Sequence, residues 1–312
     1  MITLIFSNGK TIQAQNDVTA NEVLENFEKT ENLVAVKINN EVCSLNQSIK
    51  VNSNIEPIYI NSTEGSSIYR RSLCFVLAAA AQKLFSNKRL LVGHSLGYGY
   101  FYTFDNSEIT QDEIASLKSL MAEIIASDKQ ITQEIVSYQD ATARLSSQNM
   151  TETRKQLDFI AKPTFIMNVL EGFSDIYYAP LVESTGILKV FDLVPYEKGF
   201  LLRFPTTKEP EKLSEFVDSP KLFGVYKKYK EWGKEVLRKY LQECLESKVG
   251  FKSKVAKILL FNDGSTSHRE KGRGARLIVE RIAASNSYVD YQIIWCAAAF
   301  SLENFFCESV AG

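Results

Sequence analysis

Apolar residues recur at every second position at the start of the chain, the spacing of β-strands. The run Ile2–Phe6 meets Asn8-Gly9, a strong hairpin signal, before a second strand. Thr19, with Glu22 three residues on, is typical of a helix start. Further strands are expected over residues 33–38 and 55–60, around a turn at 39–40. Two strands, a helix and further strands predict a ubiquitin-like β-grasp domain over residues 1–62.

A second domain, with a different spacing of apolar residues, is predicted over residues 66–212. It follows a Ser/Thr/Gly-containing break at 61–67. Residues 72–85 are apolar almost all round, as in a core helix. Thr110 and Glu113 form a capping box for a helix with apolar residues at three- and four-residue spacing. The remaining segments predict two strands around a glycine-rich corner over 90–104, a strand over 131–136, a helix capped by Ser137 and strands over 165–204. The whole is α+β, with helices on one face of an antiparallel sheet.

Residues 213–245 predict one amphipathic helix with a basic outer face. That face can be read as an RNA contact or, as is usual for such runs, as a solvated surface. Its basic residues are Lys227, Lys228, Lys230, Lys234, Arg238 and Lys239. Residues 246–312 form an atypical tail that mixes glycines, a charged cluster and an apolar stretch. Two hypotheses for its last fifty or so residues stand side by side: a genuine terminal segment, and an out-of-frame translation.

The composition of the chain argues against several classes of function. The 312 residues carry 36 Lys plus Arg against 37 Asp plus Glu, so no overall charge argues for wrapping nucleic acid or coating a membrane. The five cysteines form no CxxC pair and there are two histidines, which leaves no zinc cluster. The longest apolar run, Leu73 to Ala81, is too short to span a bilayer, and no signal peptide is evident. We therefore expect a cytoplasmic protein with no membrane partner.

Three stretches of the chain carry a family resemblance. They are YRRSLCFVLAAAAQKLF at 69–85, HSLGYGYFYTFD at 94–105 and STGILKVFDLVPYEKGFLLRFP at 184–205. Together they resemble a TGS domain followed by the second additional domain of threonyl-tRNA synthetases, as fused to bacterial uridine kinases. The third stretch and PKLFGVYKKYKEWGK at 220–234 resemble the kinase fusion more than a synthetase. The resemblance implies a TGS β-grasp and then a domain like the editing domains of threonyl- and alanyl-tRNA synthetases.

The resemblance does not extend to editing chemistry. The synthetase domain uses a histidine pair spaced HxxxH and a later cysteine and histidine. Laid on this sequence, the four positions hold Arg71, Phe75, Tyr177 and Leu181. Arginine stays protonated, and phenylalanine and leucine have no proton to move. The sequence therefore predicts no catalytic residue and no metal site.

The kinase half of the family is also missing its central motif. A uridine kinase needs GxxxxGK[ST] to hold the triphosphate. The one GK[ST] string is Gly9-Lys10-Thr11, with Leu4 at the upstream glycine position, and a hairpin turn explains it better. We therefore expect no cofactor and no phosphoryl transfer by this chain alone, with a separate kinase domain as one candidate partner.

A small set of residues is proposed to bind a ligand. An arginine pair at a helix start holds phosphate or carboxylate well, and a solvated helix start is the competing interpretation. His94 lies in a glycine-rich corner, where a structural role is more common than catalysis. The set is Tyr69, Arg70, Arg71, His94 and Arg203.

Two functions remain. The first is a non-catalytic, nucleotide- or RNA-binding regulatory front part of a uridine-kinase-like protein that lacks its kinase domain. The alternative is a free-standing tRNA- or RNA-binding protein related to the accessory domains of threonyl-tRNA synthetase. An intact kinase reading frame downstream favours the first, and specific retention of tRNA favours the second.

Overall fold

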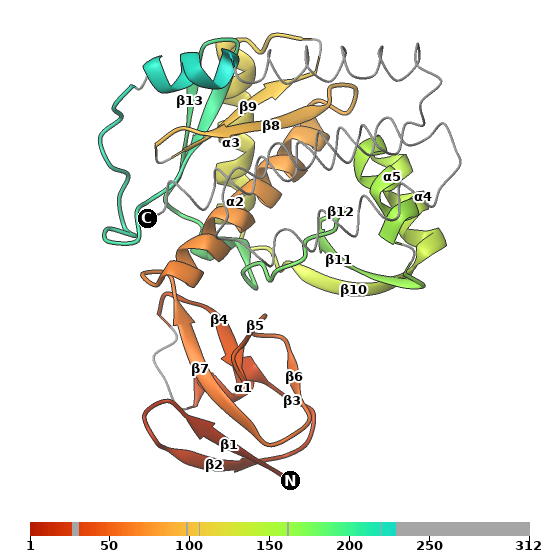
Figure 1. The fold of residues 1–312 in the computed structure, drawn as a ribbon, viewed down its shortest axis with the longest axis vertical. Coiled ribbons are helices and arrows are strands. Elements are labelled where there is room, and N and C mark those ends of the chain that lie inside the picture. The colour runs from red at the N-terminus through yellow and green to blue at the C-terminus, as the bar shows by residue number, and fades with distance from the viewer. Residues whose placement is uncertain (27–30, 98, 106, 161, 219, 229–312) are drawn as a thin grey trace, which may run out of the picture. The chain divides into compact units, whose positions relative to one another are not determined.

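The computed structural model describes residues 1–26, 31–97, 99–105, 107–160, 162–218 and 220–228 (Figure 1). The chain divides into two compact units, Met1–Val217 and Asp218–Gly312. The first unit is a mixed α+β structure, as the sequence predicts. Within the described residues, no helix is both long and apolar enough to cross a membrane.

The N-terminal sheet follows the predicted order of elements. Five strands pair in the order β2-β1-β7-β4-β5, with β1 and β7 parallel and the other pairs antiparallel. Gly9 takes a φ of +82° in the predicted hairpin turn, and Thr19 and Glu22 form the predicted capping box. The bounds are β1 Ile2–Phe6, β2 Thr11–Ala14, β3 Val18–Thr19, α1 Ala20–Glu25, β4 Leu33–Ile38, β5 Glu41–Cys43, β6 Ser48–Ile49 and β7 Ser53–Tyr59; β3 and β6 pair separately.

Helix α2 (Thr63–Leu84) begins at Thr63, whereas the sequence predicted a break there and a start at Ser72. The side chain of Ser62 accepts a hydrogen bond from the backbone N–H of Gly65, which caps the helix early. A Cβ on Gly65 would collide with the carbonyl oxygen of Tyr59, so glycine lets the helix start directly behind β7. Tyr69 to Arg71 therefore lie inside α2, and the helix N-terminus invoked for their anion site is not beside them.

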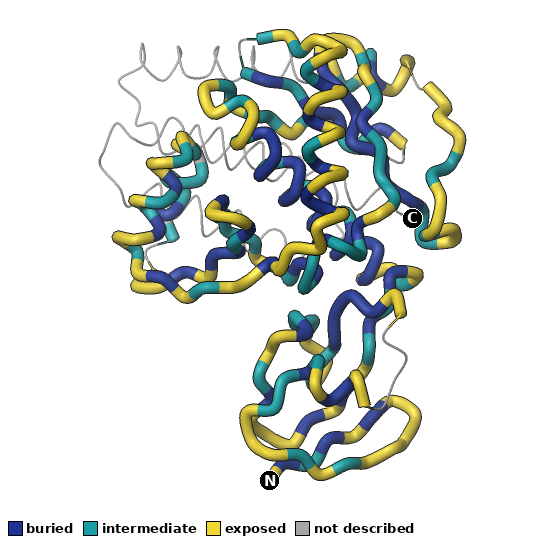
Figure 2. The backbone as a smooth tube through the Cα atoms, turned by 180° about the vertical axis from the view of Figure 1, so that it is seen from behind, coloured by how far each residue is buried: buried dark blue, intermediate teal, exposed yellow. Residues whose placement is uncertain are grey.

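The rest of the first unit contains two separate sheets, where one had been predicted. A four-stranded antiparallel sheet has the order β13-β14-β9-β8, and a three-stranded one the order β10-β11-β12. Residues of α2, α3 and the four-stranded sheet share the main core, and Figure 2 shows α2 buried along most of its length. A smaller core joins α4 and α5 to β10 and β11. The bounds are β8 Leu90–Ser95, β9 Gly99–Phe104, α3 Gln111–Ala126, β10 Thr132–Ser137, α4 Tyr138–Ser147, α5 Thr151–Ile160, β11 Thr164–Leu170, β12 Phe173–Asp175, η1 Thr185–Ile187, β13 Asp192–Tyr196 and β14 Gly199–Arg203.

Several local predictions for this region are confirmed. Thr110 and Glu113 cap α3, whose apolar residues at the predicted spacing are buried, and Ser137 caps α4. The predicted helix over 213–245 is described only in part: residues 220–228 are helical, while 213–218 form no regular element. The basic residues beyond Lys228 and the tail 246–312 lie outside the described residues.

Candidate functional site

Tyr69, one of the predicted ligand-binding residues, holds two parts of the fold together. Its side chain is buried in α2, and its hydroxyl donates to the carbonyl oxygen of Val190 at 3.1 Å. The same hydroxyl accepts from the backbone N–H of Val190 at 2.9 Å. Burial raises the pKa of Tyr69 well above its usual value, so the hydroxyl keeps its proton. Tyr69 thus ties α2 to the segment that leads into β13.

We expect Tyr69→Phe to lower the free energy of unfolding by about 1–2 kcal/mol, because it leaves both backbone groups of Val190 without this partner. The check is a pair of urea unfolding curves followed by circular dichroism. Tyr178→Phe is the matched control, since Tyr178 is 69% exposed. Equal midpoints for Tyr69→Phe and the wild type would show that the hydroxyl contributes nothing.

The three arginines of the predicted site make different hydrogen bonds. Arg70 donates within its own helix to the Ser66 carbonyl oxygen at 3.3 Å and to the Ser67 hydroxyl at 3.1 Å, and its guanidinium also lies over the ring of Phe204. Arg203 is buried, donates to the carbonyl oxygen of Ser214 and lies over the ring of Phe216. Both guanidinium groups thus have protein partners, and they donate to different acceptors.

Arg71 makes its hydrogen bond outside its own helix. One of its terminal nitrogens donates to the carbonyl oxygen of Pro180 at 3.0 Å, across a loop far along the chain. Burial lowers the pKa of its guanidinium, and Tyr100, Tyr177 and Cys74 act in the opposite direction. His94 lies in β8, half-buried, where the β8–β9 register shifts, and burial lowers its pKa.

Arg71 lies in a group of side chains that we name the Arg71 cluster: Arg71, Cys74, Tyr100, Tyr102, Asn168, Asp175 and Tyr177. The hydroxyl of Tyr102 hydrogen-bonds to the thiol of Cys74, and burial raises the pKa of Tyr102. Burial also raises the pKa of Tyr177, which interacts with Asp175, Cys74 and Arg71. One face of α2 thus meets β9 and the end of β12 in a group of polar side chains inside an otherwise apolar core.

Asp175 is the titratable group of this cluster near neutral pH. Burial raises the pKa of its carboxyl from 3.8 to about 7, although a hydrogen bond from the backbone N–H of Ile176 partly opposes the rise. The carboxyl therefore exchanges its proton around neutral pH. In that range it donates a hydrogen bond in one state and only accepts in the other.

Asn168 faces Asp175 across the sheet. The strand register pairs Asn168 of β11 with Asp175 of β12 on one side and with Gln133 of β10 on the other. The carboxamide oxygen of Asn168 accepts from Gln133 at 3.3 Å. Asn168 is fully buried, yet its carboxamide nitrogen donates to no acceptor among the described residues. An unpartnered buried donor calls for a partner that the described residues do not supply, such as a water molecule, an ion or a ligand.

The four positions aligned with the synthetase editing motif do come together. The rings of Phe75 and Tyr177 are 5.6 Å apart, edge to face. Arg71 interacts with Tyr177 and bonds the carbonyl oxygen of Pro180, the residue before Leu181. Among the described residues, no three metal-binding side chains are grouped to hold an ion.

Sequence reasoning identified Arg71 and Tyr177 but missed Cys74, Tyr100, Tyr102 and Asn168. Cys74 stands one helical turn from Arg71, so helical spacing offered a signal for it. Asn168 offered none, since a single polar residue in an apolar strand reads equally well as exposed. Its burial depends on strand pairing with β10 and β12.

Part of the chain is similar in sequence to known proteins. No family model matches the chain. The chain is 24% identical over 191 residues to the threonine–tRNA ligase of Maridesulfovibrio salexigens, covering 60% of this chain and 30% of that protein. It is 27% identical over 197 residues to that of Ehrlichia chaffeensis, with 62% and 31% covered. The similarity concerns the N-terminal region of these ligases. The chain thus spans about a third of the length of the relatives it matches.

Proposed function

We propose that this chain is a tRNA- or RNA-binding accessory protein, homologous to the N-terminal region of threonine–tRNA ligases and without their editing chemistry. The observation that carries the proposal is the Arg71 cluster, which includes two of the four positions aligned with the editing motif, Arg71 and Tyr177. The sequence similarity to threonine–tRNA ligases supports it from a second side. The comparisons favour this function over the uridine-kinase interpretation.

The side chains of the cluster support binding rather than hydrolysis. Arg71 supplies a cation suited to a phosphate, and Asn168 supplies a donor that has no partner in the part of the chain that the structure describes. Hydrolysis would need a positioned base next to an activated water or nucleophile. Phe75 and Leu181 replace two of the aligned polar groups with buried apolar ones.

The test is retention of RNA by the purified full-length chain. We expect unfractionated tRNA to bind, and Arg71→Gln to weaken binding by about tenfold, the effect of one lost charge-assisted contact. Arg70→Gln is the matched control, because Arg70 bonds within its own helix. Binding is measured by fluorescence anisotropy at a stated salt concentration. Absence of tRNA binding, or equal losses in the two variants, contradicts the proposal.

The finer assignment of the chain to a kinase fusion remains a second proposal, supported by the strings at 184–205 and 220–234. In it, residues 1–62 form a TGS β-grasp and residues 66–212 an editing-like domain, followed by a helical segment at 213–245. A cytoplasmic protein with a kinase reading frame immediately downstream fits this version. Sequencing the gene past its last codon separates the two proposals, and resequencing the codons of residues 246–312 decides whether that segment is in frame.

A further inference from the structure

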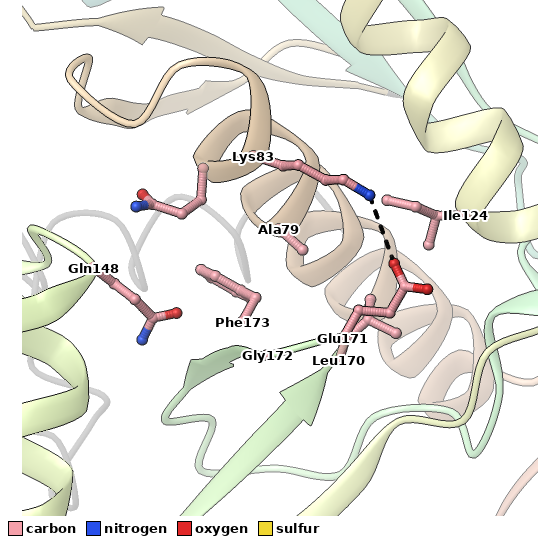
Figure 3. Close-up of a pocket in the computed structure, with 9 residues that line it drawn as sticks. Ala79, Lys83, Ile124, Gln148, Leu170, Glu171, Gly172 and Phe173 are labelled. Atoms are coloured by element: carbon pink, nitrogen blue, oxygen red, sulfur yellow. Dashed lines mark ion pairs between the residues drawn. The ribbon is translucent and has the colours of Figure 1, made fainter.

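A cleft of about 250 Å³ lies beside the C-terminal part of α2, which contributes Ala79, Gln82 and Lys83 to its lining (Figure 3). Its apolar wall comes from Ala79, Leu170 and Phe173. The ring of Phe173 is held in place by Phe75, 5.4 Å away between ring centres. We name this site the Lys83 cleft, after the lysine at its rim.

One lysine and one glutamate, Lys83 and Glu171, line the Lys83 cleft, and Lys129 pairs with Glu171 from outside the lining. Lys83 extends toward Glu171 in the turn between β11 and β12, as Figure 3 shows, but their charged atoms are 3.9 Å apart. Lys129 approaches the other oxygen of Glu171 more closely, at 3.3 Å. Glu171 is therefore balanced by Lys129, and the 62% exposed side chain of Lys83 is only loosely paired. The half-buried amide of Gln82 adds a donor and an acceptor to the wall.

We propose that the Lys83 cleft binds one nucleotide, with the base against the Phe173 wall and the phosphate at Lys83. An apolar wall with an aromatic ring accepts a base of any sequence, an amide pairs with a base edge, and a loosely paired lysine binds phosphate. The cleft is smaller than most ligand pockets, so it holds one nucleotide at most. The inference rests on the proposed RNA-binding function and extends it to a second contact.

Arg71 and Lys83 lie at different places on α2. Twelve residues separate them, which corresponds to about 18 Å along the helix axis and about 120° around it. Phe75 and Ala79, which lie between them, are buried. A contact at the Lys83 cleft is therefore separate from a contact at Arg71.

The test uses opposite charge changes at the cleft in the full-length chain. The probes are a labelled ten-nucleotide single-stranded RNA, followed by anisotropy, and unlabelled AMP, followed by calorimetry. We expect Lys83→Gln to weaken RNA binding about fivefold and to reduce the salt dependence by about 0.7, the value for one phosphate contact on a single strand. Glu171→Gln removes the carboxylate of the cleft and is expected to strengthen binding.

Lys198→Gln is the control, because Lys198 also pairs with a glutamate, at 2.8 Å, but lies outside the cleft. If the wild type binds RNA and neither Lys83→Gln nor Glu171→Gln changes the affinity, the cleft is not a nucleotide site and the proposed function stands. If RNA does not bind but AMP does, in a Lys83-dependent manner, the cleft takes free nucleotides and the RNA function fails. If neither probe binds, both proposals fail.

Discussion

Phe75→Ala should lower the free energy of unfolding by about 3–5 kcal/mol. The side chain of Phe75 is fully buried in the middle of α2 and packs on two other rings, Phe173 and Tyr177. Its removal leaves a cavity between α2 and β12 that the rings on either side cannot fill without moving. Urea unfolding of the full-length chain, followed by circular dichroism, gives the change in midpoint.

Tyr178→Ala is the matched control for Phe75→Ala. It removes an aromatic side chain that is 69% exposed, so a change within about 0.5 kcal/mol is expected. A loss below about 1 kcal/mol for Phe75→Ala would show that the Arg71 cluster is looser than the structure indicates.

Asp175→Asn should stabilise the protein at pH 8, by about 3 kcal/mol, and flatten the dependence of its stability on pH. The carboxyl has a pKa of about 7 in the folded chain against an ordinary value of 3.8. The folded state therefore holds a proton that the unfolded state has lost between these two values. The contribution of this carboxyl to the free energy of unfolding is complete below about pH 4. It declines by about 1.4 kcal/mol per pH unit as the pH rises toward 7.

Unfolding midpoints at several values between pH 5 and 8 test this expectation, with Glu211→Gln as an exposed control. The isosteric amide keeps the acceptor for the N–H of Ile176 and stays neutral. The free energy of unfolding of the variant should therefore not decline as the pH rises through this range. The two tyrosines near the carboxyl, Tyr177 and Tyr178, keep their protons through this range because their pKa values are raised. Parallel pH profiles for Asp175→Asn and the wild type would contradict a buried, titrating carboxyl.

Local sequence determined the elements whose ends depend on nearby residues. The Asn8-Gly9 turn, the caps at Thr19 and Thr110, and the buried stripe of α3 all formed as predicted. In each case the interaction spans only a few residues, so the pattern and the structure report the same contact. The α+β class followed from the same signals.

The start of α2 shows where such signals are not enough. Residues 61–67 read as a break because they are rich in Ser, Thr and Gly. In the folded chain Ser62 caps the helix, and Gly65 lets it pass close to the backbone of Tyr59. Whether a small polar segment ends one domain or begins a helix depended on the strand packed beside it.

The candidate site was decided almost entirely by tertiary structure. Adjacent arginines with the same sequence signal point to different partners, Arg70 to its own helix and Arg71 to Pro180, 109 positions away. The buried amide of Asn168 and the raised pKa of Asp175 exist only because β11 pairs with β10 and β12. Sequence alone determined which side chains are available, whereas burial and pairing between distant strands decided which of them meet, because both depend on contacts that no local pattern encodes.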